Sequence, residues 1–385
     1  MSYIDDIFLM DDIFSIEQEA EQKYGIHIPN VSHWDSSIDF QKIMTQVLVL
    51  PPQSLPWNYC YSYSFSKEER KQVLQHLGIQ TQQLHDTMGL LLQSSTIAIV
   101  NMINLLVHFQ YKKLCILLPA YFSVAFCCSS LSLEYGIEQM LFMKGQPQIP
   151  IDKIAKGGYD SIWITSPIFC TGYYPDEKML KDIKLLKSLG ITVVFDESLT
   201  LPGKELVRSF PIDKNTFAIY SPHKSIAMNG IKFAVIVCDL FYEDFLEQWV
   251  DVFSGALGSS NRDAVFHYLS PNYWESCFPA YKTYINSTKK IVSNILEQYS
   301  FASMLPATEG HYINIFMDLK IQSKKELLKF HKDIVHNCLA SFIPASLNGF
   351  DCSQNFGFRI NLTGNKLELE GAIGRIMKYL SAQYQ

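Results

Sequence analysis

Charged side chains are scarce in this chain of 385 residues. They make up 18% of it, whereas hydrophobic residues make up 48%, and the formal net charge is −6. Acidic and basic residues are mixed along the chain, so the basic surface that binds nucleic acid is not expected. The hydrophobic content excludes a disordered protein and predicts a large core. The length fits two domains or one large α/β domain.

Cysteine motifs are also missing, although nine cysteines occur. None forms a CxxC pair or lies at the spacing of zinc ligands, so no metal site is predicted. Most stand in apolar runs, where a free cysteine behaves as a small hydrophobic residue, and this favours a reducing compartment such as the cytoplasm. No GxGxxG follows a strand and no GxxxxGK[ST] occurs, so nucleotide binding is only weakly indicated.

Long charge-free runs are rare, and the one at 114–133 does not predict a membrane span. It has the length of one, but Pro119 divides it and four serines dilute it. Its first part is typical of a buried strand and its second part of a helix. The N-terminus is acidic and lacks a basic segment, so it does not predict a signal peptide.

The middle of the chain alternates between two patterns. Short apolar runs predict strands at 89–95, 113–119, 159–167, 191–198, 215–221 and 232–238. Helical spacing predicts helices at 96–109 and 176–190, the second ending at Gly190. Such alternation is typical of an α/β domain, with a mostly parallel sheet covered by helices on both faces.

The last third of the chain has a different pattern. It predicts helices at about 264–299, 324–338 and 366–382, and strands at 312–319 and 355–363. We therefore expect three parts: an N-terminal arm at 1–45, a large domain at 46–255 and a smaller α+β domain at 256–385. No internal repeat and no low-complexity tract is present.

Polar residues that follow the predicted strands are candidate site residues, because ligands of parallel sheets bind beyond the carboxyl ends of the strands. Such positions are held by Ser95, Thr96, Tyr121, Asp196, Ser221 and Lys224. Taken singly, each has a plainer interpretation. Lys224 is typical of a surface lysine, Asp196 of a turn residue, and Ser95 with Thr96 of a helix N-cap. Their order and spacing are more informative.

Six motifs follow one another along the chain. They are "SSTIAI" (94–99), "LLPAY" (117–121), "TSPIFCTG" (165–172), "VVFDES" (193–198), "SPHKSIAMNGIKFA" (221–234) and "FRINL" (358–362). From about residue 45 onward the chain thereby resembles the fold-type-I enzymes of pyridoxal 5′-phosphate, the aspartate-aminotransferase superfamily. The resemblance implies a large domain with a seven-stranded, mostly parallel sheet flanked by helices, plus a smaller α+β C-terminal domain.

The resemblance also implies a role for each candidate. Lys224 would form an imine with the aldehyde of pyridoxal 5′-phosphate and move protons, and Asp196 would keep the pyridine nitrogen protonated. Arg359 would bind the α-carboxylate of an amino acid or keto acid, and Trp34 is a candidate for lining the substrate side chain. The implied cofactor contacts are Ser95, Thr96, Ser221 and Lys232 for the phosphate, Tyr121 and Phe169 at the ring, and Tyr59 for the phosphate of the other subunit. Tyr59, with Tyr61 as its fallback, thus implies a homodimer with shared active sites.

The chain departs from the family's pattern at four positions. Phe169 replaces an asparagine and Leu199 a tyrosine, both of which usually donate hydrogen bonds to the phenolic oxygen of the cofactor. Lys232 replaces the phosphate arginine, and Ser94 replaces a glycine. The candidates for supplying the missing contacts are Thr165, Ser166 and His223.

Three functions remain open at this stage. The first is a divergent aminotransferase, and the second is other pyridoxal-phosphate chemistry such as decarboxylation, replacement or condensation. The third is a non-catalytic relative, which the changed asparagine and tyrosine positions favour and the intact Lys224, Asp196 and Arg359 oppose. Neither the substrate nor the pathway can be read from the sequence.

Overall fold

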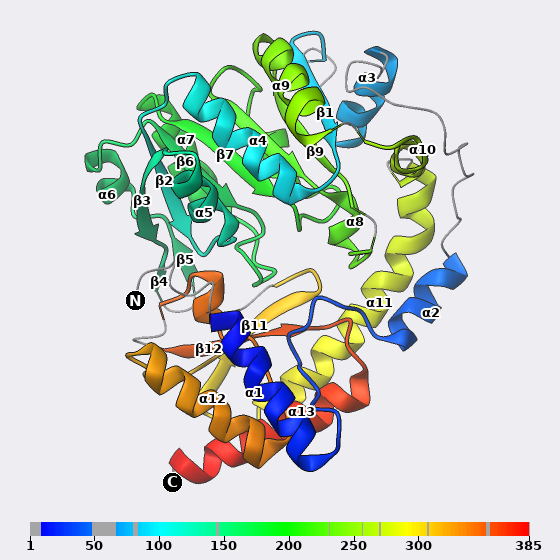
Figure 1. Cartoon of the computed structure of the whole chain (residues 1–385), viewed down its shortest axis with the longest axis vertical. Coiled ribbons are helices and arrows are strands. Elements are labelled where there is room, and N and C mark those ends of the chain that lie inside the picture. The colour runs from blue at the N-terminus through cyan, green and yellow to red at the C-terminus, as the bar shows by residue number, and fades with distance from the viewer. Residues whose placement is uncertain are drawn as a thin grey trace. The chain divides into compact units, whose positions relative to one another are not determined.

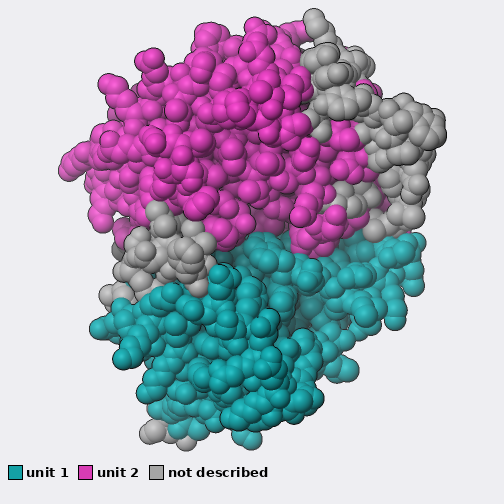
Figure 2. All heavy atoms as spheres, viewed as in Figure 1, with its two compact units in different colours: residues 1–46, 170–173, 279–385 teal, residues 47–169, 174–278 magenta. Residues whose placement is uncertain are grey.

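The computed structural model describes residues 9–47, 67–79, 84–143, 146–230, 232–255, 257–268, 271–305, 308–351 and 355–384. The chain forms two compact units, which Figure 2 colours separately. Unit 1 combines residues 1–46, 170–173 and 279–385, and unit 2 combines residues 47–169 and 174–278. Each unit is therefore built from segments that are distant in the sequence.

Unit 2 contains a seven-stranded sheet in the order β1-β9-β8-β7-β6-β2-β3. Its strands are β1 (Thr87–Leu92), β2 (Lys113–Leu118), β3 (Glu134–Gln139), β6 (Ser161–Thr165), β7 (Thr192–Glu197), β8 (Thr216–Tyr220) and β9 (Ala234–Asp239). The pairings that link β3, β2, β6, β7 and β8 are parallel, whereas β9 is antiparallel to both of its neighbours. The expected seven-stranded, mostly parallel sheet is confirmed.

Helices cover this sheet because its central strands are apolar on both faces. Every residue of β6, β7 and β8 is buried. Helix α4 (Ser95–His108) packs against β1, β8 and β9 (Figure 1). The remaining elements of unit 2 are α3 (Lys67–His76), α5 (Ser123–Ser130), β4 (Leu141–Met143), β5 (Gln146–Gln148), α6 (Ile151–Lys156), α7 (Glu177–Ser188), α8 (Pro222–Ser225), α9 (Glu243–Trp249) and α10 (Ser259–Tyr268).

Unit 1 is built around a three-stranded antiparallel sheet in the order β10-β11-β12. Its elements are α1 (Leu9–Tyr24), α2 (Ile38–Val47), the larger part of α11 (Pro271–Leu296), β10 (Ala302–Met304), β11 (Tyr312–Met317), α12 (Lys324–Cys338), β12 (Phe356–Asn361) and α13 (Lys366–Tyr384). The N-terminal helix α1 packs against α12, and the ion pairs Lys324–Asp12 and Lys332–Glu19 join the two helices. The expected smaller α+β unit is confirmed.

Two further features of the sequence can be compared with the structure: the charge-free run and the change of domain. The charge-free run at 114–133 forms β2 and α5, which Pro119 separates as expected. Within the described ranges, no helix has the length and hydrophobicity needed to cross a membrane. The sequence places a change of domain near residue 255, in the loop before α10, whereas the division between the units falls inside α11, at Phe278. A division inside a helix leaves no break in the helical pattern that a sequence analysis could detect.

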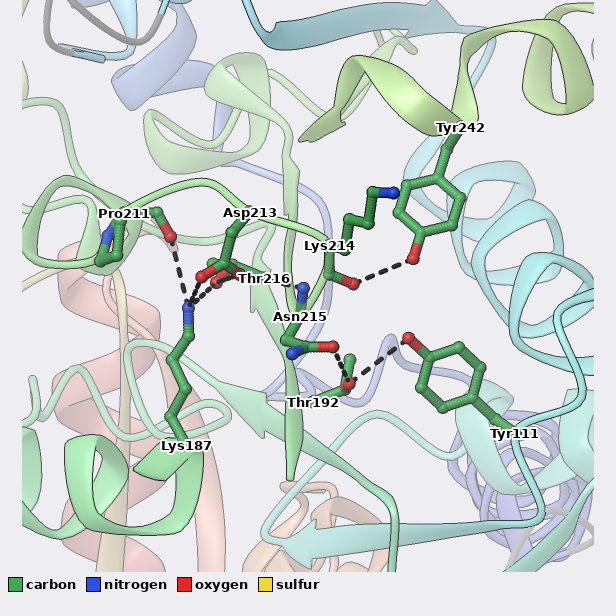
Figure 3. A network of polar contacts seen from close by, with 9 residues as sticks. All are labelled: Tyr111, Lys187, Thr192, Pro211, Asp213, Lys214, Asn215, Thr216 and Tyr242. Carbon is green, nitrogen blue, oxygen red and sulfur yellow. Dashed lines mark hydrogen bonds and ion pairs between the residues drawn. The ribbon is translucent and has the colours of Figure 1, made fainter. Parts of the chain in front are cut away.

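A network of polar contacts joins α7 to the amino ends of β7 and β8 (Figure 3). The Lys187 Nζ on α7 donates to Asp213 Oδ2 at 2.7 Å and to Thr216 Oγ1 at 2.5 Å. The Thr192 hydroxyl donates to Asn215 Oδ1 at 3.1 Å. Burial works to raise the pKa of Asp213, but the bonds from Lys187, Asn215 and Thr216 outweigh it and hold the pKa below its ordinary value of 3.8. This network fastens α7 to the edge of the sheet opposite the strand ends considered below.

We expect Lys187→Met to lower the free energy of unfolding by about 1–2 kcal/mol, because the half-buried ammonium group loses its hydrogen bonds to Asp213, to Thr216 and to the Pro211 carbonyl. Urea denaturation of both proteins measures the difference. The difference in free energy of unfolding between the two proteins should become smaller below pH 3.8. The pKa of Asp213 is lowered on folding, so this carboxyl group stabilises the protein only while it is ionised. Lys181→Met, at an exposed position of the same helix, is the control and should change stability little. A Lys187 variant as stable as the control would contradict this role.

Candidate active site

The carboxyl ends of β6, β7 and β8 meet at one edge of the sheet in unit 2. Asp196 on β7 is in register with Thr165 on β6 and with Ile219 on β8. Paired residues of neighbouring strands point to the same face, so the side chains of Thr165 and Asp196 share one side of the sheet. Two of the strand ends singled out from the sequence are therefore immediate neighbours.

Lys224 lies in the short helix α8, which directly follows β8. Its backbone N–H donates to the Ser221 carbonyl at 2.9 Å, and its own carbonyl accepts from the Ala227 N–H at 3.1 Å. The Lys224 Nζ donates to the Ser95 Oγ at 2.5 Å. The lysine loop and the start of α4, which are 129 residues apart in the chain, thus meet at this edge.

The start of α4 is polar and carries the ordinary signs of a capped helix. The Ser94 Oγ accepts a hydrogen bond from the Ile97 N–H at 3.2 Å. The Ser95 side chain is buried, whereas Thr96 is exposed. The Ser221 Oγ is buried and has no hydrogen-bond partner among the residues that the structure describes. A helix N-terminus beside such hydroxyls and an ammonium group is suited to hold a phosphate.

Asp196 is a buried carboxyl group, only 3% exposed. Its Oδ1 accepts hydrogen bonds from the Ser198 hydroxyl at 2.7 Å and from the Ser198 N–H at 3.2 Å. Burial raises the pKa of Asp196, while the bonds from Ser198 and the charge of Lys224 act in the opposite direction. The raised pKa means that the hydrogen bonds and charges around Asp196 do not fully offset the cost of burying its ionised carboxylate. A cationic N–H group bound beside it would help to offset this cost.

A chain of buried hydrogen bonds connects the lysine loop to Asp196. The Ser225 hydroxyl donates to the Thr200 carbonyl at 2.5 Å, and the Thr200 hydroxyl donates to the Ser166 carbonyl at 2.5 Å. The Ser166 N–H in turn donates to the Asp196 carbonyl at 2.9 Å. Thr200 therefore fixes the loop after β8 against the ends of β6 and β7. The sequence analysis missed Thr200, because nothing local distinguishes it from an ordinary turn threonine.

We expect Thr200→Val to lower the free energy of unfolding by about 1–3 kcal/mol, because the fully buried Ser166 carbonyl loses its donor while the side-chain volume is kept. Thermal and urea denaturation test this. Thr200→Ser, which retains a hydroxyl, should recover most of the loss. If the valine variant is as stable as the serine variant, the hydroxyl does not hold the loop.

An aromatic pair flanks this edge of unit 2. The ring centroids of Tyr121 and Phe169 are 5.7 Å apart, and the rings are tilted by 49°. Phe169 is buried and stands where the resemblance expects an asparagine. A phenyl ring donates no hydrogen bond, so any donor to a ligand here has to come from other residues.

The three residues expected to replace that donor all have polar atoms without a partner in the described part of unit 2. They are the buried hydroxyls of Thr165 and Ser166 and both ring nitrogens of His223. Burial, assisted by the charge of Lys224, lowers the pKa of His223 to about 3, so its ring is neutral at neutral pH. Buried polar atoms rarely lack a partner, and a ligand would provide one.

The other predicted residues are less closely associated. Leu199 is half-buried and Lys232 is exposed. In the described ranges, no hydrogen bond or ion pair joins Lys232 to the other candidates. Tyr59 and Tyr61 lie outside the residues that the structure describes.

Arg359 and Trp34 come together in unit 1. Arg359 on β12 is 2% exposed, and its guanidinium carbon lies 4.3 Å from the ring centroid of Trp34 and 5.1 Å from that of Tyr312. The Arg359 Nε and Nη2 both donate to the Ser32 carbonyl, at 3.2 and 2.7 Å. The Arg359 Nη1 lies 3.7 Å from the Cys170 sulfur. The sequence analysis predicted Arg359 and Trp34 but missed Ser32 and Cys170.

The guanidinium group of Arg359 retains donors for an anion. A guanidinium has five N–H groups. The Ser32 carbonyl takes two and the Cys170 sulfur faces one, so each terminal nitrogen keeps one N–H. No carboxylate of the described residues forms an ion pair with Arg359. A buried cation without a counter-ion is costly, and a carboxylate bound through two oxygens would remove that cost.

The residues of unit 2 fit pyridoxal 5′-phosphate. Lys224 provides an amine for the aldehyde. The buried carboxyl group of Asp196 would be stabilised in its ionised form by a protonated pyridine nitrogen. The start of α4, with Ser95 and the partnerless Ser221 hydroxyl, is suited to the phosphate. The aldehyde, the pyridine nitrogen and the phosphate of the cofactor would therefore each meet a chemically matched group in this unit.

Comparisons with known proteins agree with this fold. Searches of protein-family models and of curated proteins found no match. Solved structures do match. An aminotransferase from Mycobacterium tuberculosis has a TM-score of 0.74 at 14% identity, covering 98% of this chain and 97% of that chain. An alanine aminotransferase from Pyrococcus furiosus has a TM-score of 0.74 at 16% identity, covering 97% of each chain. A pyridoxal-phosphate-bound C-S lyase from Staphylococcus hominis has a TM-score of 0.68 at 16% identity, covering 93% of each.

These likenesses establish the fold. The chain has the architecture of the fold-type-I aminotransferases, as the motifs predicted. At identities of 14–16% they establish the fold and not the reaction.

Proposed function

We propose that this protein is a pyridoxal-phosphate-dependent aminotransferase acting on an amino acid or related amine through Lys224. The observation that carries the proposal is the contact between the Lys224 Nζ and the Ser95 Oγ at the start of α4, beside the strand that holds the buried Asp196. It supports the proposal because an amine, a helix N-terminus suited to a phosphate and a buried carboxyl group then lie at one edge of the sheet.

When bound, pyridoxal 5′-phosphate supplies an aldehyde and an electron-withdrawing ring. In the proposed enzyme, Lys224 attaches the cofactor and then moves the proton of the substrate's α-carbon. Asp196 holds the proton at the pyridine nitrogen. Ser95, Ser221 and the amides of α4 hold the phosphate. The Arg359 guanidinium binds the substrate carboxylate.

The remaining assignments belong to the same proposal. Tyr121 would pack on the cofactor ring, Thr96, Lys232 and Tyr59 would complete the phosphate site, and Trp34 would line the substrate. Tyr59 would come from the partner subunit of a homodimer with shared active sites. The seven described cysteines are all free and buried, which supports a reducing compartment such as the cytoplasm.

The test is an absorbance spectrum of the purified protein before and after borohydride, followed by a peptide map. Borohydride should fix the cofactor on the peptide that contains Lys224. A protein that stays colourless and unmodified with added pyridoxal 5′-phosphate would support the non-catalytic alternative.

Phe169 favours a second candidate, other chemistry on the same cofactor. With a phenyl ring in place of the usual amide, the cofactor's phenolic oxygen has to find different donors, and one solved structure with this fold is a C-S lyase. The half-reaction separates the two candidates. An aminotransferase converts the cofactor to its amine form with an amino donor alone, without a second substrate.

A further inference from the structure

A chain of hydrogen bonds, buried at Arg359 and Ser32 and part-buried at Asn30, leads from Arg359 to the N-terminal helix α1 within unit 1. The Ser32 carbonyl accepts two bonds from the Arg359 guanidinium, and the Ser32 hydroxyl donates to the Arg359 carbonyl. Ser32 therefore holds Arg359 at its backbone and at its side chain. The Ile343 N–H donates to the same hydroxyl at 2.8 Å, which fixes Ser32 from the other side.

Asn30 fixes the position of Ser32. The Asn30 Oδ1 accepts a hydrogen bond from the Ser32 N–H at 2.8 Å, and the Asn30 Nδ2 donates to the Glu17 Oε1 at 2.7 Å. Both ends of the amide are engaged, so its orientation is determined. The path from α1 to the guanidinium is thus Glu17, Asn30, Ser32 and Arg359.

Glu17 occupies a position where an apolar residue would be expected. The buried residues of α1 are Leu9, Ile13, Glu17 and Ala20, which lie at helical spacing on one side of the helix. A buried glutamate costs stability unless its oxygens are satisfied, and a well-packed apolar residue would often serve packing as well. The Glu17 Oε1 accepts hydrogen bonds from the Asn30 Nδ2 and from the Ser341 hydroxyl, at 2.7 and 2.5 Å, which offsets part of this cost. The Glu17 carboxyl group therefore takes part in the hydrogen bonds that lead to Arg359, and it does not contribute an apolar contact to the buried side of α1.

The consequence for Arg359 is geometric. The Ser32 carbonyl is its only carbonyl or carboxylate partner among the described residues of unit 1, so the direction of the two remaining N–H groups depends on where Ser32 lies. A bidentate contact with a carboxylate needs both N–H groups aligned with both oxygens. A small displacement of Ser32 would therefore weaken anion binding without removing the guanidinium.

We propose that Asn30 is a positioning residue for Arg359, and that α1, through Glu17 and Asn30, sets the affinity of Arg359 for a carboxylate. The role of Arg359 as a carboxylate site rests on the proposed function. The additional claim is that helix α1, distant from Arg359 in the sequence, controls that affinity.

The experiment is a calorimetric titration of the purified full-length protein with succinate, an unreactive dicarboxylate. The wild type should bind succinate, and Arg359→Ala should abolish binding. Asn30→Ala and Glu17→Leu should each weaken binding about tenfold, the size of one well-placed hydrogen bond to a charged group. Glu17→Gln keeps the Oε1 acceptor and should stay within about twofold of the wild type.

The matched control is Ser341→Ala, which removes the second donor to Glu17 but leaves the bond between Glu17 and Asn30. It should bind succinate as the wild type does. If Ser341→Ala weakens binding as much as Asn30→Ala, or if Asn30→Ala loses thermal stability but binds normally, the chain is a scaffold and the proposal is overturned. Should Glu17→Leu not fold, Asn30→Ala, which removes one small amide, decides the question.

The two proposals can fail separately. Succinate binding that depends on Arg359 in a protein that takes up no cofactor would overturn the proposed function and leave the role of Asn30 intact. A protein whose cofactor is fixed on Lys224 but whose succinate binding is absent, or is unaffected by Arg359→Ala, would overturn the present inference and the carboxylate role of Arg359, and leave the role of Lys224 intact.

Discussion

Replacing Lys224 by alanine is expected to abolish the fixation of the cofactor by borohydride and to lower turnover by a factor on the order of 10⁴ or more. The alanine has no amine to attach the cofactor and none to move the substrate proton. The fold should survive, because the bonds of Ser225 and Thr200 hold the loop independently of the Lys224 side chain. Absorbance spectra, peptide mapping and steady-state kinetics measure the three effects.

Lys224→Arg is the matched variant. It keeps a positive charge beside Ser95, but a guanidinium stays protonated and does not attach an aldehyde. It should therefore be as inactive as the alanine variant while folding like the wild type. Substantial turnover by either variant would refute the assignment of Lys224 and, with it, the proposed enzyme.

The large unit could be predicted from the sequence because its signals are local. The apolar runs that form β6, β7 and β8 lie between polar loops, and α7 begins at a capping Asp176 and is followed by Gly190 at positive φ. The approach of Lys224 to Ser95 was implied by the resemblance, since both lie at strand ends that a parallel sheet brings to one edge.

The polar chain around Arg359 could not be predicted in this way. Asn30 and Ser32 lie in a loop without periodicity, and their partners are more than 300 residues away in the chain. Glu17 interrupts the apolar side of α1, so it weakens the very pattern that would have indicated the helix. Contacts of this kind depend on tertiary packing, which residue types and spacing do not encode locally.

Asp196→Asn should lower kcat by about 10²–10³-fold, the usual cost of removing one preorganised electrostatic group from an active site. The asparagine Oδ1 can still accept both bonds from Ser198, so the local structure should persist. In the proposed enzyme, what is lost is the negative charge that would keep a proton on the pyridine nitrogen. Steady-state kinetics and the absorbance of the bound cofactor would show this loss.

The same substitution should not destabilise the cofactor-free protein. Because burial raises the pKa of Asp196 above 3.8 on folding, the folded state holds a proton that the unfolded state has released in the pH range between the two values. Stability therefore falls with rising pH in that range, and the asparagine variant should escape this fall. A cofactor-free variant that is clearly less stable than the wild type at neutral pH would mean that the carboxylate is structural.

Glu197→Gln is the control that isolates the role of Asp196. Glu197 is the next residue on β7, is fully buried, and points to the opposite face of the sheet, where it accepts bonds from the Leu206 and Val207 amides. Burial raises the pKa of Glu197 to about 8, and burial also raises the pKa of Asp196, but the two side chains lie on opposite faces of the sheet. Its substitution should change stability but not kcat. If kcat falls equally in both variants, the strand end as a whole matters, and Asp196 has no special function in the chemistry.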